Sequence, residues 1–290
     1  MMIEEVKLIE CPRDAMQGIK SHFIPTELKV KYINSLLKVG FDTIDFGSFV
    51  SPKAIPQMRD TDKVLKLLDL SSTRSKLLAI VANVRGANDA CAFEEINYLG
   101  YPFSISENFQ MRNTHKTISE SIDVLKDILN IATRNNKEVV AYLSMGFGNP
   151  YGDPWNVEIV AEWTEKLANF GVKIVSLSDT VGSSTPDVID YLFSNLISQY
   201  PQIEFGAHLH TTPHKWFEKV DSAFKAGCRR FDGAIKGYGG CPMAKDELTG
   251  NMPMEKMLSY FTTNKVNTNT KPMSFESAYN KALDVFNFIG

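Results

Sequence analysis

Short apolar runs alternate along the chain with longer segments in which apolar residues recur every three or four positions. The first pattern predicts buried strands, and the second predicts helices that pack on one face. Strands are expected at residues 6–11, 43–49, 76–83, 101–106, 138–145, 172–178, 204–210 and 229–235. Helices are expected at residues 26–39, 60–70, 87–99, 117–135, 156–170, 185–199, 213–226, 254–261 and 275–288.

Eight strand–helix units in strict alternation predict a parallel sheet, and eight strands are the number that closes a barrel. We therefore expect an α/β fold, a (β/α)8 TIM barrel in a single domain over residues 1–290, with the last helices as a C-terminal extension. A doubly wound open sheet is the alternative. It is disfavoured because no GxGxxG motif follows the first strand.

The composition argues against nucleic acid and membranes as binding partners. The 290 residues are 43% hydrophobic and 22% charged, with a net charge of −3, so no basic field favours nucleic acid or an anionic membrane. No apolar run approaches the roughly 20 residues that span a bilayer. Residues 1–10 lack a secretory or transit pattern, so a cytoplasmic location is expected. The cysteines form no CxxC pair, which indicates reduced thiols.

Polar residues gather where the predicted strands end, and a barrel places its active site at the C-terminal ends of its strands. Strands six, seven, eight, one and two form one continuous arc of a closed barrel, and the polar residues lie along it. They are Arg13, Asp14, Asp45, Ser48, Asp179, His208, His210, Cys241 and Asn251.

His208 and His210 stand two positions apart on a strand, so both rings point to the same face. Alone, the pair fits equally well two histidines held by backbone hydrogen bonds. With Asp14 and Asn251 on neighbouring segments, a mixed nitrogen and oxygen site for Mg²⁺, Mn²⁺, Zn²⁺ or Fe²⁺ is favoured.

Each remaining candidate has a plainer alternative. Arg13 beside Asp14 could be a surface ion pair, although both follow a buried strand. Asp45 among apolar neighbours is costly unless it is paired or functional. Asp179 fits the start of the next helix equally well. Cys241 follows two glycines, which suits either a tight turn or a mobile lid that carries a thiol over the metal.

Several segments together resemble the 3-hydroxy-3-methylglutaryl-CoA lyase family, from about residue 6 to residue 288. The matching segments are PRDAMQ at 12–17, SFVSPK at 48–53 with PQM at 56–58, SDTVG at 178–182, HLH at 208–210, GGCP at 239–242 and GN at 250–251. The joint match is specific to metal-dependent lyases and Claisen condensation enzymes. Within that wider family, SFVSPK with PQM, and GGCP, point to the lyase branch.

The resemblance implies a role for each matched residue. Asp14, His208, His210 and Asn251 would ligate a divalent cation, most simply Mg²⁺ or Mn²⁺. The catalytic candidates are Arg13, Cys241, Asp45 and Asp179, and the substrate-binding candidates are Gln17 and Ser48. An acyl-CoA substrate and a homodimer are implied in the same way.

The chain also departs from the family pattern. Asp45 stands for a glutamate, Thr211 follows the histidine pair where an aspartate is usual, and the stretch from Cys241 to Asn251 is one residue longer. These changes bear on acyl specificity more than on metal chemistry.

The expected reaction is retro-Claisen cleavage of 3-hydroxy-3-methylglutaryl-CoA, or a related 3-hydroxyacyl-CoA, to acetyl-CoA and acetoacetate. A condensing synthase acting on 2-oxo acids, or a lyase for another acyl thioester, is the alternative within the same wider family. A non-catalytic barrel that binds acyl-CoA is the alternative from another class.

Overall fold

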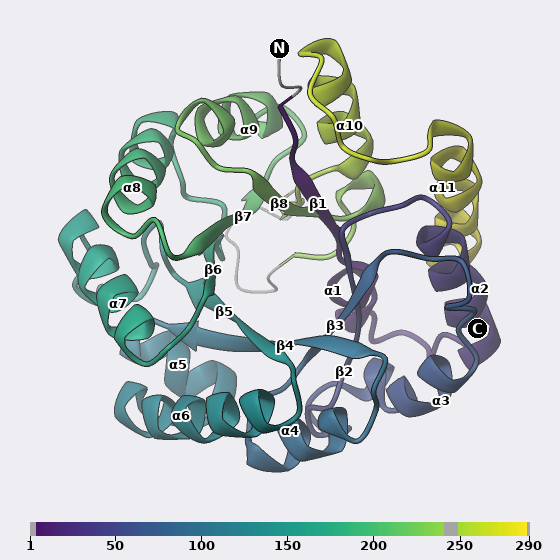
Figure 1. The fold of residues 1–290 in the computed structure, drawn as a ribbon, viewed down its shortest axis with the longest axis horizontal. Helices are drawn as coiled ribbons and strands as arrows, with labels where there is room; N and C mark the ends of the chain where they lie inside the picture. The colour runs from purple at the N-terminus through teal and green to yellow at the C-terminus, as the bar shows by residue number, and fades with distance from the viewer. Residues whose placement is uncertain (1–3, 241–248, 289–290) are drawn as a thin grey trace.

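Eight parallel strands close into a barrel around which the helices form an outer ring (Figure 1). The computed structural model describes residues 4–240 and 249–288. The barrel strands are β1 (Lys7–Glu10), β2 (Thr43–Ser48), β3 (Lys76–Ile80), β4 (Ile96–Ser104), β5 (Glu138–Ser144), β6 (Ile174–Asp179), β7 (Glu204–Thr211) and β8 (Arg230–Gly233). Neighbours pair in sequence order, and β8 pairs with β1. The predicted TIM barrel is confirmed, and the open sheet is excluded.

Along the chain the helices fall between the barrel strands, as the alternation predicts, except for the last two, which follow them. They are α1 (Pro12–Gln17), α2 (Thr26–Leu37), α3 (Thr61–Lys66), α4 (Val84–Cys91), α5 (Glu107–Thr114), α6 (Ile118–Arg134), α7 (Val157–Asn169), α8 (Pro186–Gln199), α9 (Trp216–Lys225), α10 (Met254–Thr263) and α11 (Pro272–Phe286). Local capping fixes several starts. At α6, Thr117 and Glu120 form a reciprocal capping box, and Asn156 caps α7.

The apolar core has two parts. A large cluster fills the space between the outer face of the barrel and the helices. A smaller cluster fills one side of the barrel interior, and its members are Leu78, Ile80, Tyr98, Val140, Tyr142 and Ile174. The other side of the interior is polar, with Arg230, Asp232 and Ser176 all buried. This polar half lies on the arc of strands where the candidate residues were expected.

A short strand outside the barrel brings a distant segment to the site. Strand β9 (Gly250–Asn251) pairs antiparallel with the end of β7, so that Asn251 lies opposite His210. Asn251 is thereby placed next to the histidine pair, although 40 residues separate the two along the chain.

The largest difference from the predicted bounds lies in residues 84–106. The helix expected over residues 87–99 ends at Cys91, and the strand expected over residues 101–106 begins at Ile96, because Ile96 and Tyr98 are buried in the barrel wall. A short apolar run fits a buried strand and a helix equally well by periodicity. Helices α1 and α5 were not predicted, and both border the site described below.

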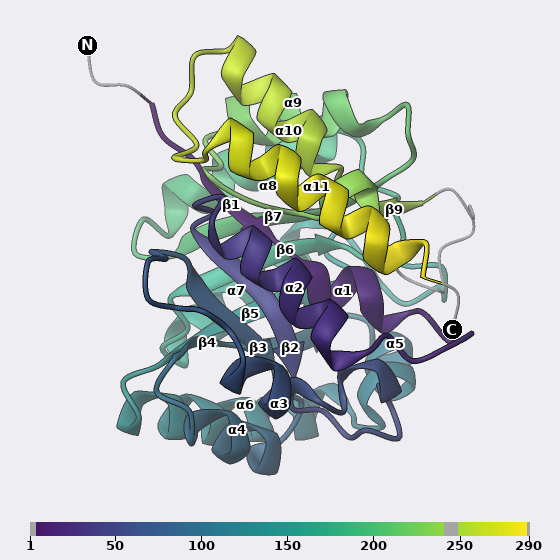
Figure 2. The same cartoon turned by 90° about the vertical axis from the view of Figure 1, so that its right-hand side faces the viewer.

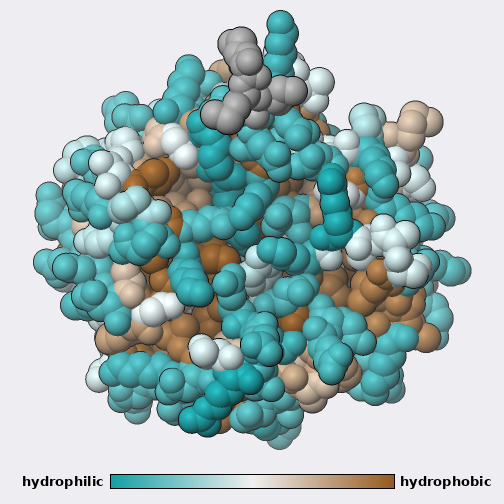
Figure 3. All heavy atoms as spheres, in the orientation of Figure 1, coloured by the Kyte–Doolittle hydropathy of each residue, from teal (hydrophilic) through white to brown (hydrophobic). Residues whose placement is uncertain are grey.

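The C-terminal helices pack on the outside of the ring. Figure 2 shows α11 running beside α2, and Phe275 of α11 contacts Phe41 edge to face with ring centroids 6.4 Å apart. The face seen in Figure 3 is largely hydrophilic, with apolar atoms showing in recesses between polar side chains. None of the helices within residues 4–240 and 249–288 is long and apolar enough to cross a membrane.

Candidate active site

Helix α1 carries Arg13 and Asp14 into the mouth of the barrel. Pro12 occupies its first turn, directly after β1 ends, so the next two side chains are held where the strand stops. Both are buried. Arg13 donates through Nη1 to Asp14 Oδ1 at 3.0 Å. These residues were expected at a strand end, and the structure places them on the helix that follows.

Arg13 is clamped by a second carboxylate from the next strand. Its Nε lies 3.1 Å and 3.0 Å from the two carboxylate oxygens of Asp45, and its Nη2 lies 2.5 Å from Oδ2. Asp45 is fully buried. Burial raises its pKa to about 6, although the adjacent guanidinium of Arg13 lowers it. Burial alone would lower the pKa of Arg13. The nearby carboxylates of Asp45 and Asp14 have the larger, opposite effect and raise the pKa above its usual value, so the guanidinium stays charged. Asp45, whose burial among apolar neighbours would be costly for an unpaired carboxylate, is therefore paired with Arg13.

The two histidines face the same cavity from β7, as their spacing predicts. Their ring centroids lie 5.3 Å apart. Nδ1 of His208 lies 3.1 Å from Asp232 Oδ2, and Nδ1 of His210 lies 3.0 Å from the carbonyl oxygen of Thr180. A carbonyl oxygen can only accept, so the proton of a neutral His210 sits on Nδ1. Its Nε2 is buried and has no hydrogen-bond partner.

Asp14, His208 and His210 together form a cluster suited to a cation. One ligand atom from each lies within 4.8 Å of the others. Burial alone would raise the pKa of Asp14. Arg13 and the two histidines together have the larger, opposite effect and lower this pKa below its usual value, so the carboxylate is ionised. One carboxylate, one orphaned imidazole nitrogen and a second imidazole are donors that Mg²⁺, Mn²⁺ or Zn²⁺ accepts. The side chains present therefore fit a divalent metal.

Asn251 and Gln17 touch this cluster through Asp14. Asn251 Nδ2 donates to Asp14 Oδ2 at 2.7 Å and to the carbonyl of Tyr238 at 2.8 Å. Gln17 Nε2 donates to the other oxygen of Asp14 at 2.7 Å. The two glycines before Cys241 have positive φ, 86° at Gly239 and 116° at Gly240. Their unusual backbone conformation agrees with the expectation from the sequence. Cys241 itself lies outside the described residues.

Two candidates are not brought to the cluster. Asp179 ends β6 with its carboxylate turned toward Lys219 of α9, whose Nζ donates to it at 2.7 Å. Ser184, in the loop after β6, donates to it through Oγ at 2.5 Å. Asp179 is not among the residues that line the cavity. Ser48 borders a separate neighbouring cavity, where its hydroxyl accepts from the backbone N–H of Val50 at 3.2 Å.

The cluster opens into a cavity of about 300 Å³. Arg13, Asp14, Gln17, His208 and His210 lie on its wall, and α5 contributes Phe109, Asn113 and Thr114. Most of the remaining lining residues are apolar or carry a hydroxyl group, and they are Val50, Ala54, Ile55, Ile80, Ala82, Pro102, Tyr142, Ser144, Ser178 and Thr180, with Gly240 at the edge.

Sequence reasoning missed Asp232, Thr180 and Tyr142. Asp232 stands on β8 two positions after Arg230, so the strand period places both on one face. A carboxylate two residues from a buried arginine, on the strand next to the histidine pair, was the signal available. Thr180 acts through its backbone, which side-chain patterns do not reveal.

The barrel and its buried carboxylate–histidine cluster define a TIM-barrel enzyme whose side chains fit a cation at the C-terminal ends of its strands. The HMGL-like family model matches residues 6–281, and the chain belongs to that family. It is a carbon–carbon lyase by that membership.

Individual relatives agree. The chain is 33% identical over 268 residues to hydroxymethylglutaryl-CoA lyase of Bacillus subtilis, covering 90% of this chain and 86% of that protein. The HMG-CoA lyase of Brucella melitensis superposes with a TM-score of 0.91 at 29% identity, over 98% of this chain and 100% of that one. An HMG-CoA lyase from Acinetobacter baumannii, solved with coenzyme A and 3-methylmalate, gives a TM-score of 0.88 at 26% identity, over 98% and 92%.

Proposed function

We propose that this lyase cleaves 3-hydroxy-3-methylglutaryl-CoA to acetyl-CoA and acetoacetate. The observation that carries the proposal is the convergence of Arg13, Asp14, His208 and His210 on one cavity. The relatives named for this reaction, and the coenzyme A bound to one of them, support an acyl-CoA substrate.

Asp14, His208 and His210 would hold a divalent cation, Mg²⁺ or Mn²⁺, and Asn251 stands beside them as the fourth ligand candidate. When bound, such an ion supplies Lewis acidity and a template for the substrate oxygens. The chain prepares for it by keeping Asp14 ionised and by leaving Nε2 of His210 without a partner.

Arg13 would stabilise the charge that develops during cleavage. Loss of the proton from the tertiary alcohol lets its oxygen form the ketone of acetoacetate, and the broken C–C bond leaves its electron pair on the acetyl-CoA enolate. Arg13 is a permanent cation on the cavity wall, suited to donate to the enolate oxygen. Asp45 fixes its orientation through three short contacts.

Two proton transfers complete the reaction. Asp45 is our candidate for the base, because it contacts Arg13 on the cavity wall and burial raises the pKa of its carboxylate above the usual value. Asp179 is less suited, because its carboxylate faces the ammonium group of Lys219 on the outer helix α9. We assign the return of a proton to the enolate carbon to Cys241, by the resemblance and because the preceding residue, Gly240, lines the cavity.

A related 3-hydroxyacyl-CoA is the second candidate substrate. Thr211 is buried with its hydroxyl bound to the carbonyl of Thr212 at 2.9 Å, so the carboxylate usual after the histidine pair is replaced by a neutral group. A homodimer and a cytoplasmic location are further proposals that rest on the resemblance and the residue pattern alone.

The test is acetoacetate release from 3-hydroxy-3-methylglutaryl-CoA with Mg²⁺ or Mn²⁺, repeated with EDTA and with Cys241→Ala. Metal-dependent turnover that collapses in the variant supports the proposal. Folded protein that binds Mn²⁺ yet releases no acetoacetate would exclude this substrate. Parallel assays with other 3-hydroxyacyl-CoA thioesters, and with 2-oxo acids plus acetyl-CoA, then identify the alternative.

A further inference from the structure

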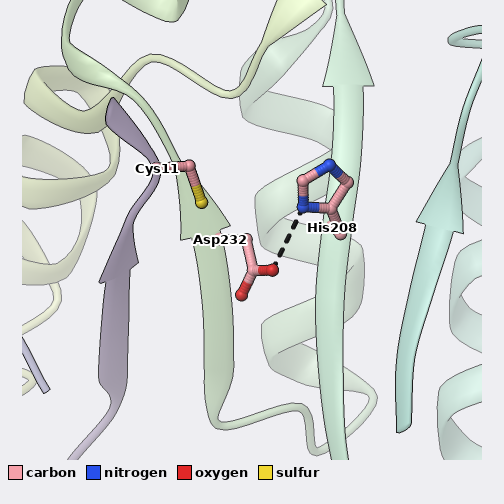
Figure 4. Close-up of side chains that lie close together, drawn as sticks. All are labelled: Cys11, His208 and Asp232. Atoms are coloured by element: carbon pink, nitrogen blue, oxygen red, sulfur yellow. Dashed lines mark hydrogen bonds and ion pairs between the residues drawn. The ribbon is translucent and has the colours of Figure 1, made fainter. Parts of the chain in front are cut away.

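Asp232 is a buried carboxylate that the proposed reaction does not use. It stands on β8, its side chain is 1% exposed, and its Oδ2 lies 3.1 Å from Nδ1 of His208. Figure 4 shows this contact, with the second ring nitrogen of His208 pointing away from Asp232. In this contact the carboxylate oxygen accepts a hydrogen bond from Nδ1–H of His208, which leaves Nε2 free for a cation.

The two histidines are thus held by different partners. His210 donates through Nδ1 to the uncharged carbonyl of Thr180, whereas His208 faces a carboxylate. A carboxylate behind a ligating imidazole fixes its tautomer and makes the imidazole more basic. The ring of His208 is 12% exposed and lies between Tyr142 and His210, with ring centroids 5.4 Å and 5.3 Å away, so it stands at the edge of the cavity where its orientation decides which nitrogen faces a cation.

A buried cation lies near Asp232 in the barrel interior. Arg230 precedes Asp232 by two positions on the same face of β8. Its Nη1 pairs with Glu204 at 3.4 Å and Asp42 at 3.9 Å, whereas its Nε and Nη2 are buried without partners. Asp232 Oδ1 and the hydroxyl of Tyr142 are also buried without partners. Gly206 makes room for this arrangement, since a Cβ there would meet Arg230 Cδ and Ser176 Oγ at 3.1 Å. The polar half of the barrel therefore surrounds the carboxylate that contacts His208 with a buried cation and a buried hydroxyl group.

We propose that Asp232 is a positioning residue for the cation, acting through His208 by holding its Nδ1–H so that Nε2 faces Asp14 and His210. The inference rests on the proposed metal site. A competing arrangement exists, because Cys11, His208 and Asp232 also place one ligand atom each within 4.8 Å (Figure 4). There Asp232 would itself be a ligand for a soft cation such as Zn²⁺.

Asp232→Asn tests the positioning role, because it keeps the shape and removes the charge. We expect Mn²⁺ affinity, measured by calorimetry on the full chain, to fall about 10- to 100-fold. Nitrogen NMR of the His208 ring should show loss of the single Nδ1-protonated tautomer, which a merely structural role would not change. Cys11→Ala is the matched control, since it alters the same cluster but keeps the carboxylate, and Mn²⁺ affinity should be unchanged.

The remaining outcomes separate the two proposals. If Asp14→Asn and His210→Ala abolish Mn²⁺ binding while Asp232→Asn leaves both affinity and tautomer unchanged, the role of Asp232 is refuted and the metal site stands. If Asp14→Asn and His210→Ala also bind Mn²⁺ normally, the metal site itself is wrong. Equal loss of Zn²⁺ binding in Cys11→Ala and Asp232→Asn would make Asp232 a ligand and overturn the positioning role. Circular dichroism confirms that each variant is folded.

Discussion

The ammonium group of Lys219 on α9 donates a hydrogen bond to the carboxylate of Asp179 at 2.7 Å, and neither side chain is more than 1% exposed. The same ammonium group also donates to the backbone carbonyls of His210, at 2.8 Å, and Gly182, at 3.2 Å. This pair ties the outer helix to the strand ends that carry His210. It explains why a carboxylate at the end of β6 faces away from the cavity.

Breaking this pair from one side should destabilise the fold. Lys219→Met leaves Asp179 charged, buried and without its cation, so we expect the free energy of unfolding to fall by about 3–5 kcal/mol. Urea denaturation measures the change. Asp179→Asn combined with Lys219→Met should be more stable than Lys219→Met alone, because neither charge is then left unpaired. A double variant as unstable as the sum of the single variants would contradict the pairing.

Arg13→Lys should impair catalysis more than folding. Lysine keeps the charge but cannot reproduce the planar fork that contacts both oxygens of Asp45 while reaching Asp14. We expect kcat for acetoacetate release to fall about 100- to 1000-fold. Arg134→Lys, on the exposed end of α6, is the control and should leave kcat unchanged. Wild-type turnover in Arg13→Lys would remove the guanidinium from the mechanism.

Glu10 should make stability depend on pH. Burial raises its pKa from 4.5 to about 8, and only its Oε1 has a close donor, the backbone N–H of Ile235 at 2.9 Å. The folded state therefore binds this proton more tightly than the unfolded state. Its contribution to the free energy of unfolding is full below pH 4.5 and is lost as pH rises to about 8.

Glu10→Gln removes the charge and should remove this slope. At mildly alkaline pH we expect the free energy of unfolding of the variant to exceed that of the wild type by on the order of 1–4 kcal/mol. At acidic pH the two free energies of unfolding should be similar. Urea denaturation across that range measures the difference, with Glu94→Gln, at an exposed position, as the control. An unchanged slope in Glu10→Gln would show that Glu10 is already ionised in the fold.

Gly239→Ala should disturb the site from outside the cation cluster. Gly239 has φ of 86°, and an added Cβ would lie 2.7 Å from Ala15 Cα and 2.8 Å from the carbonyl oxygen of Asp14. The left-handed backbone alone costs an alanine about 1–2 kcal/mol, and the backbone contacts force the segment away from Asp14. Mn²⁺ affinity and acetoacetate release should both fall.

Gly18→Ala is the matched control for this change. Gly18 has φ of −78°, and an added Cβ would meet nothing within 4 Å. It should retain wild-type affinity and turnover. Equal behaviour of the two variants would mean that the backbone beside Asp14 yields freely.

The sequence by itself determined the barrel and the charged and imidazole side chains that line the cavity, but not its apolar and hydroxyl-bearing lining. Alternating apolar and amphipathic segments predict a parallel sheet, because each strand must be covered by the helix that follows it, and the number of eight strands favours closure into a barrel. The two-residue period of a strand put His208 and His210 on one face, and the strand ends brought Arg13 and Asp14 toward them. These are local properties that a pattern can carry.

Only the tertiary structure decided which partner each polar group meets. Asp179 and Lys219 are 40 residues apart, and Asp232 lies 24 residues beyond His208, so neither pairing leaves a periodic trace. The start of β4 at Ile96 was equally hidden, because a short apolar run packs into a barrel wall or under a helix with similar burial. Asn251 reaches Asp14 only because β9 pairs with β7. Charge pairing across strands depends on which side chains share a buried space, and folding alone creates that space.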